Sequence, residues 1–311
     1  MHNKTTKRLL PRLLVLVLSA MSFWSCDTIY DDLSDCHMYI QFKYDYNMDK
    51  TDKFADQCDK VEVFLFDANG VLVRTITDSG ENLKKAGYRI EIPIHSGNYT
   101  VMAWAGRKDS YDLTDMTVGT STKDDLVLKL KSTANTHDGE LEPLWSGTPV
   151  DFTYTGSSHH VETIDLVKNT NRVNLQVNMD SDLEVKIMGA NGSYLYDNSF
   201  ADTQTITYKP FSTTKTTGQS SFSFSSLRLV KGQDVRLSVI DKTTGKSLLP
   251  AGDWDLIAYL LKTKPSGMTD QEYLDRQDTW NISLHIDGYI AVSIEINGWI
   301  VWNQDSELGK L

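Results

Sequence analysis

Residues 61–73 read Val-Glu-Val-Phe-Leu-Phe-Asp-Ala-Asn-Gly-Val-Leu-Val. Val61, Val63 and Leu65 recur at every second position, which is the period of a strand that buries one face. The turn residues Asp67–Gly70 follow, and a second apolar run begins at Val71. Turn residues of this type between two apolar runs are typical of a β-hairpin. The stretch therefore predicts two paired strands.

The same alternation recurs through the rest of the chain. Met38, Ile40, Phe42 and Tyr44 form one such series near the start. Further strand-like runs are Tyr88–Ile94, Tyr99–Trp104, Val161–Val167, Arg172–Met179, Leu183–Ile187, Phe222–Leu229, Val235–Ile240, Trp280–Ile286, Ala291–Ile296 and Trp299–Trp302. Many short strands separated by Gly, Asn and Asp predict an all-β sandwich or barrel.

Short helices are expected only near the C-terminus. Asp253 can cap a helix over Trp254–Leu261, and Pro265 follows as a stop signal. Thr269 and Glu272 have the spacing of a capping box for a second short helix that ends near Arg276. Neither segment changes the all-β assignment.

Polar composition divides the chain into two domains. Residues 132–158 are largely polar, and a new series of strands begins directly after them. We therefore place a boundary near Ser157, which gives an N-terminal domain over residues 26–157 and a C-terminal domain over residues 158–311. Residues 1–25 precede both domains.

The first 25 residues have the pattern of an export signal. Four cations, Lys4, Lys7, Arg8 and Arg12, precede a short apolar core and small residues. This core is too short to span a bilayer. Cys26 follows directly, which favours the lipoprotein form, with the cysteine acylated as the mature N-terminus. Ordinary secretion with a free or paired Cys26 is the alternative.

Two further cysteines, Cys36 and Cys58, remain if Cys26 carries lipid. In an oxidising compartment they could form a disulfide worth roughly 3 kcal/mol in the chain-entropy model. The cysteine count supports this pairing without proving it. Two buried or unpaired thiols are the alternative.

The charge of the chain excludes two classes of partner. The formal net charge is −11, and the segment before Cys26 holds four cations and no acid, so the remainder is more acidic still. Nucleic acids need clustered cations, as do anionic membrane faces bound through a basic patch. No later stretch is apolar enough for a transmembrane helix, so acyl chains would be the only membrane attachment.

No catalytic or metal-binding constellation is predicted. His159 and His160 are adjacent, but only Glu162 accompanies them, whereas zinc sites need three or four converging ligands. The tryptophans allow a sugar-binding role instead. Trp104, Trp280, Trp299 and Trp302 lie in strand patterns and are expected in the core, whereas Trp145 lies in a polar stretch and is expected to be partly exposed. We expect no metal, no cofactor apart from the covalent lipid, and no small-molecule substrate.

Several segments in colinear order resemble a known family. They are Cys36–Asn47, Cys58–Gly70, Gly97–Gly106, Leu144–Gly147, Leu256–Leu261, Glu272–Arg276 and Ile294–Val301. Together they resemble the fimbrial anchoring subunits of Bacteroidales, the FimB-like lipoproteins. The resemblance covers nearly all of the chain after Cys26.

This resemblance implies two tandem transthyretin-like Greek-key β-sandwich domains. It also implies lipid at Cys26, a surface-exposed position on the cell outer membrane, and a fimbrial shaft subunit as partner. In such fimbriae a shaft subunit loses its N-terminal strand, and a strand from its neighbour fills the groove. A lipid-bound subunit would keep its first strand and end polymerisation.

The strand expected to contact the shaft is Trp299, Ile300, Val301 and Trp302. The alternative is that this segment simply completes the second sandwich. As a whole-protein alternative, the chain could be a glycan-binding surface lipoprotein that uses exposed aromatic residues.

Overall fold

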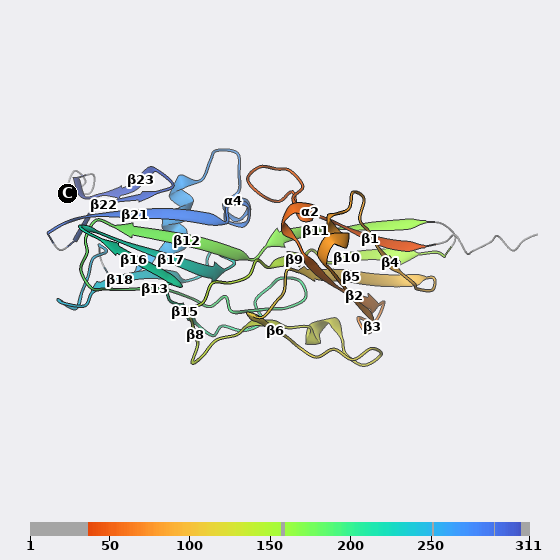
Figure 1. Ribbon diagram of the computed structural model, residues 1–311. Coiled ribbons are helices and arrows are strands. Elements are labelled where there is room, and N and C mark those ends of the chain that lie inside the picture. The colour runs from red at the N-terminus through yellow and green to blue at the C-terminus, as the bar shows by residue number, and fades with distance from the viewer. Residues whose placement is uncertain (1–36, 157–158, 251, 289, 306–311) are drawn as a thin grey trace, which may run out of the picture.

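The computed structural model describes residues 37–156, 159–250, 252–288 and 290–305. It is built mainly from strands, with short helices, so the all-β prediction is confirmed (Figure 1). Cys26 and Cys36 lie outside the described residues. Each helix among the described residues is too short or too polar to cross a bilayer.

The N-terminal half forms an eight-stranded sheet. Seven strands follow the order β3-β2-β5-β9-β11-β1-β4, and β10 pairs with β5. Their bounds are β1 (Met38–Lys43), β2 (Lys60–Asp67), β3 (Leu72–Ser79), β4 (Ile90–Ile92), β5 (Gly97–Ala105), β9 (Trp145–Gly147), β10 (Val150–Tyr154) and β11 (His160–Lys168). The helix α2 (Phe54–Gln57) and the 3-10 turn η2 (Gly80–Lys84) lie in its connections. The predicted hairpin is β2 and β3, which pair antiparallel with one bulge after Leu65.

Two sheets make up the C-terminal half. The first has the order β16-β17-β12-β21-β22-β23, and the second β19-β18-β13-β15-β8, with β20 paired to β18. The first sheet contains β12 (Thr170–Val177), β16 (Ser212–Thr216), β17 (Gln219–Leu227), β21 (Thr279–Asp287), β22 (Ile290–Ile296) and β23 (Trp299–Asn303). The second contains β8 (Thr136–His137), β13 (Leu183–Gly189), β15 (Ile206–Tyr208), β18 (Val235–Asp241), β19 (Lys246–Ser247) and β20 (Trp254–Asp255). Apolar side chains from both sheets share one core.

Both predicted helices are present, with a small shift in one of them. The first helix is α3 (Leu256–Leu260). Its N-cap is Asp255, whose side chain accepts a hydrogen bond from the Ala258 N–H. The expected cap at Asp253 was therefore wrong. The second is α4 (Asp270–Arg276), where Thr269 accepts from the Glu272 N–H as the capping spacing predicts. The 3-10 turns are η3 (Lys123–Asp125) and η4 (Leu261–Thr263).

The strand pairing places the boundary between the two halves later along the chain than the sequence predicted. We expected the C-terminal domain to begin at residue 158. Instead β11 pairs in parallel with β1 and antiparallel with β9, so it belongs to the N-terminal sheet. The change therefore falls at Asn169, between β11 and β12, because a strand's alternation does not reveal which sheet it joins.

The polar connection between the halves is not a free linker, and neither is the segment before it. That preceding segment contributes β6 (Tyr111–Leu113) and β7 (Leu128–Leu130), which form a three-stranded sheet with β14 (Ser193–Tyr194). The polar connection itself contributes β8, which pairs with β15. One face of β2 and β5 packs into this region, since Phe64 and Trp104 belong to the same buried cluster as the C-terminal core. The opposite face of these strands lines a separate N-terminal core.

Candidate functional site

The first strand, β1, lies inside the N-terminal sheet. Met38, Ile40 and Phe42 are buried on one face, as their alternation predicts. On one side β1 pairs in parallel with β11, and on the other antiparallel with β4. The Gln41 side-chain amide also donates to the Thr163 hydroxyl at 2.7 Å. A strand hydrogen-bonded on both sides is costly to remove, since each buried apolar side chain contributes about 1.5–3 kcal/mol.

Histidines surround the start of β1. The His37 and Glu91 side chains lie 2.5 Å apart, and His160 and Glu162 lie 2.6 Å apart. The ring of His159 stacks on His37 with centroids 5.9 Å apart. The adjacent histidines are therefore part of a polar end of the sheet, and His160 is the first residue of β11. No metal-binding group of three or more ligands is found in the described part of the chain.

The predicted contact strand, Trp299–Trp302, forms most of the edge strand β23. Asn297 and Gly298 both have positive φ, so they make the tight turn that returns the chain from β22. Trp299 and Ile300 are 69% and 62% exposed, whereas Val301 and Trp302 pack on the core. The strand β23 completes the sheet as the alternative expects, and two of its five residues are exposed, so contact of this segment with a shaft stays a prediction. The Asn-Gly pair was the signal that could have located this turn.

The outer edge of β23 is irregular. The pairing with β22 shifts between Ile294 and Glu295, which leaves Val301 as a bulge. The Lys262 ammonium donates to the Val301 carbonyl at 3.1 Å and lies 4.0 Å from the centroid of the Tyr259 ring. A bulge and a bound lysine both hinder a further strand from pairing here. Trp299 and Ile300 are therefore available mainly through their side chains.

The exposure of the tryptophans differs from the prediction at two positions. Trp145, expected to be partly exposed, is only 1% exposed and packs edge-on against Tyr44. Trp299, expected in the core, is the most exposed large apolar side chain among the described residues. Trp104 and Trp280 are buried as predicted. Exposed aromatic surface therefore lies at the C-terminal edge and not in the connection.

Cys58 is a free, buried thiol in this structure. Burial raises the pKa of the Cys58 thiol, which keeps it protonated and unreactive. Because Cys36 lies outside the described residues, the pairing stays a prediction.

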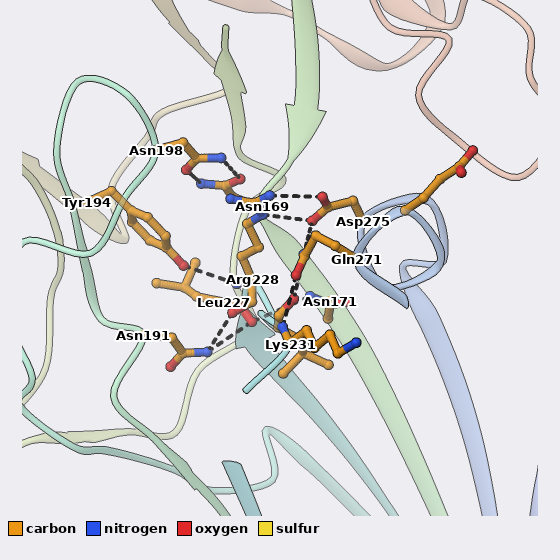
Figure 2. A network of polar contacts seen from close by, with 12 residues as sticks. Asn169, Asn171, Asn191, Tyr194, Asn198, Leu227, Arg228, Lys231, Gln271 and Asp275 are labelled. Carbon is orange, nitrogen blue, oxygen red and sulfur yellow. Dashed lines mark hydrogen bonds and ion pairs between the residues drawn. The ribbon is translucent and has the colours of Figure 1, made fainter. Parts of the chain in front are cut away.

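A buried ion pair joins α4 to the end of β17 at the junction of the halves. Figure 2 shows the Arg228 guanidinium facing the Asp275 carboxylate, with N···O distances of 2.7 and 2.8 Å. The Gln271 amide donates to the same carboxylate at 2.9 Å. Burial alone would lower the pKa of Arg228, but the hydrogen bonds and charge of Asp275 raise it overall. The Arg228 guanidinium therefore stays charged at physiological pH.

Amide side chains extend this network around the β11–β12 junction. Asn169 and Asn198 exchange two amide hydrogen bonds of 2.6 and 3.1 Å (Figure 2). Asn191 donates to the carbonyls of Leu227 and Arg228. These bonds satisfy polar groups that would be costly to leave unpaired in the interior. The network therefore fixes how β17 and α4 sit against the start of the C-terminal half.

Arg276, the last residue of α4, reaches the N-terminal half directly. One of its terminal nitrogens donates to the carbonyls of Asp45 and Asn47, at 3.1 and 3.0 Å. The guanidinium also lies 4.2 Å from the centroid of the Tyr46 ring. Alongside it, the Lys168 ammonium is 2.5 Å from the Asp278 carboxylate. These contacts connect the sheet that contains β1 to the half that contains β23.

Comparison with known proteins identifies relatives along the whole chain. A family model described as fimbrillin-A associated anchor proteins Mfa1 and Mfa2 matches residues 33–305. The minor fimbrium anchoring subunit Mfa2 of Porphyromonas gingivalis is 28% identical over 331 aligned residues, which cover 98% of this chain and 100% of that protein.

Solved structures agree in fold. A Bacteroides thetaiotaomicron protein described as a candidate polysaccharide-binding protein is 33% identical, with a TM-score of 0.79 over 85% of this chain and 97% of its own. The structure of the fimbrial anchor protein Mfa2 from Porphyromonas gingivalis has a TM-score of 0.72 at 23% identity, over 86% of this chain and 99% of its own. The second likeness concerns the fold alone.

Proposed function

The chain belongs to the family of fimbrillin-A associated anchor proteins, and we propose that it is a lipid-anchored subunit that attaches a fimbrial shaft to the outer membrane and ends its polymerisation. The family consists of structural fimbrial subunits and not of enzymes. Membership of this family implies association with a fimbrium and contact with other fimbrial subunits. The lipid, the outer membrane and the end of polymerisation are the proposed part.

The observation that carries the proposal is the position of β1. Only ten residues separate Cys26 from His37, and β1 begins at Met38. Because β1 pairs with both β11 and β4, this chain fills its own first-strand position. A subunit that gains an acyl group at Cys26 and keeps β1 offers no vacant groove there for a neighbour's strand. It would therefore stop growth at the membrane end.

Contact with the shaft is assigned to the opposite end of the molecule. Figure 1 places β1, β4 and β11 at one end and β22 and β23 at the other. Trp299 and Ile300 form an exposed apolar pair there. Exposed aromatic and aliphatic side chains of this type are common anchors of protein interfaces. The contacts of Arg276 with the carbonyls of Asp45 and Asn47 would carry force from shaft to lipid.

Lipidation is tested by replacing Cys26 with alanine. We expect Cys26→Ala to lose metabolic labelling with palmitate and to leave the membrane fraction together with its fimbria. Cys58→Ala is the matched control, because the buried thiol has no role in attachment and this variant should stay with the membrane. A Cys26→Ala protein that remains membrane-bound with its fimbria would refute the proposal.

The shaft contact is tested separately with Trp299→Ser combined with Ile300→Ser. Both side chains are exposed, so the fold should persist while less shaft protein co-purifies with the membrane. Val118→Ser is the control, since Val118 is 59% exposed but lies in the N-terminal half. Unchanged shaft recovery would show that β23 does not make the contact.

A glycan-binding role is the second candidate. It is supported by the similarity to a candidate polysaccharide-binding protein and by the exposure of Trp299. Sugars added to the purified protein would then quench tryptophan fluorescence, and Trp299→Phe would remove the effect. Absence of quenching across bacterial and host polysaccharides would eliminate this candidate.

A further inference from the structure

The C-terminal half has an open slot between its two sheets. Its volume is about 400 Å³. The floor includes the buried side chains of Leu183, Val185 and Phe222. Thr213 and Lys215 line the slot on one side, and they belong to β16, the edge strand of the first sheet. Figure 1 shows where this strand lies in the C-terminal half. The slot is therefore apolar at its base and bordered by a strand edge.

The outer edge of β16 has no partner strand among the described residues. Its pairing with β17 is regular, from Ser212 opposite Ser223 to Thr216 opposite Gln219. A two-residue turn closes this hairpin, so hydrogen-bonded and non-bonded pairs alternate from Thr216 onward. Thr213 and Lys215 are the non-bonded positions, and their N–H and C=O groups point away from β17. The edge thus offers unused donors and acceptors.

The facing strand, β13, is also incomplete at the slot. It pairs with β18 along its whole length, but β15 covers only Ile187–Gly189. Within the described ranges, no strand pairs with residues 183–186 on that side. The Gly218 N–H donates to the Asp180 carboxylate at 3.1 Å, which ties the β16–β17 turn to the loop before β13. The slot therefore lies between two segments, β13 and the β16–β17 hairpin, that are each hydrogen-bonded to other parts of the C-terminal half.

Lysines concentrate at this slot although the protein is acidic. Lys186, Lys209, Lys215 and Lys242 line it, against only Asp182 and Glu184. Lys215 and Lys242 share the Asp182 carboxylate, at 3.6 and 3.4 Å. The slot thus carries a surplus of positive charge, whereas the chain has a formal net charge of −11. An occupant with negative charge is favoured.

We propose that this slot binds an extended acidic segment of a protein partner, which adds to β16 as a further antiparallel or parallel strand. The inward side chains of that segment would be apolar and would cover Leu183 and Val185. Its carboxylates would pair with the surrounding lysines. The backbone groups of Thr213 and Lys215 would provide the hydrogen bonds. The inference concerns a site separate from β1 and β23 and stands without the anchor role.

Two other occupants fit the slot less well. A second copy of the chain would bring two lysine-rich slots together, so their charges would repel. A glycan would need an exposed aromatic surface, but Phe222, the aromatic side chain in the lining, is 4% exposed. An extended acidic segment can both hydrogen-bond to the outer edge of β16 and pair its carboxylates with the lysines of the slot.

The test uses the purified protein and fluorescein-labelled short peptides, with binding measured by fluorescence anisotropy. A peptide of alternating valine and aspartate should bind, and its affinity should fall as salt is added. A peptide of alternating valine and lysine should not bind. A valine–aspartate peptide with N-methylated backbone amides should also fail, because it cannot donate hydrogen bonds.

Three variants locate the site. Thr213→Pro removes an outward N–H without breaking the ladder to β17, and should weaken binding about tenfold. Lys215→Glu reverses a charge at the slot and should also weaken binding. Thr214→Glu is the matched control, because its side chain points to the opposite face of the same strand, and binding should be preserved.

Several results would overturn the proposal. They are no binding by the wild-type protein, equal binding of the lysine peptide, or wild-type affinity in both Thr213→Pro and Lys215→Glu. Binding of soluble polysaccharide that Lys215→Glu abolishes, without any peptide binding, would assign the slot to a glycan instead. If neither peptide nor polysaccharide binds, Lys215 is only a guard against unwanted strand pairing. None of these outcomes bears on attachment through Cys26.

Discussion

The buried pair between Arg228 and Asp275 should dominate the stability of the junction. The two side chains are 17% and 4% exposed, and the carboxylate receives both guanidinium bonds and the Gln271 amide. Replacing Asp275 with leucine removes all three and leaves a buried guanidinium without its counter-charge. We therefore expect Asp275→Leu to lower the free energy of unfolding by about 3–5 kcal/mol.

The double replacement should be much milder than either single one. Arg228→Met combined with Asp275→Leu removes both charges and fills the space with apolar atoms, which is often close to neutral. One hydrogen bond of Gln271 is still lost, at a cost of about 1 kcal/mol. The cycle of single and double variants should therefore give a coupling of several kcal/mol.

Differential scanning calorimetry measures this directly. At about 2–4 °C per kcal/mol for a chain of this size, Asp275→Leu should lower Tm by roughly 6–20 °C. The double variant should recover most of that loss. Glu81→Gln is the control, since it breaks the exposed pair with Lys84 and should leave Tm unchanged. Single variants near wild-type Tm, or a double variant whose loss equals the sum of the single losses, would refute the reasoning.

Two further predictions concern the junction and acid stability. Arg276→Ala should speed hydrogen exchange in residues 45–47, because their carbonyls lose its hydrogen bonds; unchanged exchange would show that α4 does not hold this loop. The pKa of Asp241 lies below its usual value, chiefly because the Thr243 N–H donates to its carboxylate. Its stabilising contribution is thus present above about pH 4 and lost as pH falls through the lower folded-state pKa. Asp241→Asn should therefore flatten the acid limb of a denaturation curve, and an unaltered limb would contradict this.

Local patterns predicted most strands because each depends on neighbours in sequence. The alternation from Met38 to Tyr44 matches the burial of β1, and Thr269 caps α4 as its spacing indicates. Both features arise from side chains a few residues apart. Patterns of this kind state which face is buried, and they do not state what covers it.

Long-range pairing explains what the sequence did not reveal. The partner of β11 is β1, more than a hundred residues earlier, and nothing in the alternation of residues 160–168 identifies it. Trp145 was misjudged for the same reason. Its flanks are polar, but β9 lies between β5 and β11, where a core already exists to receive the ring. The ion pair of Arg228 with Asp275 likewise joins two segments that look unremarkable in sequence.

The strand edges of the protein differ in how well they are protected, and this difference supports the proposed slot. In the N-terminal sheet, β4 is only three residues long and β3 is irregularly paired. In the C-terminal half, β23 has a bulge and is bound by Lys262. Short length, irregularity and bulges are the usual means of preventing strand addition.

By contrast, β16 is regular over five residues, rich in threonine and fully exposed. Its main protection against strand addition is Lys215, whose ammonium group repels cations and attracts carboxylates. An edge left open in this way rejects most strands but accepts an acidic one. If an acidic strand is not the ligand, β16 should promote self-association once Lys215 is neutralised. Sedimentation of Lys215→Gln therefore separates the two explanations, because a binding site alone predicts a monomer and a guard predicts aggregates.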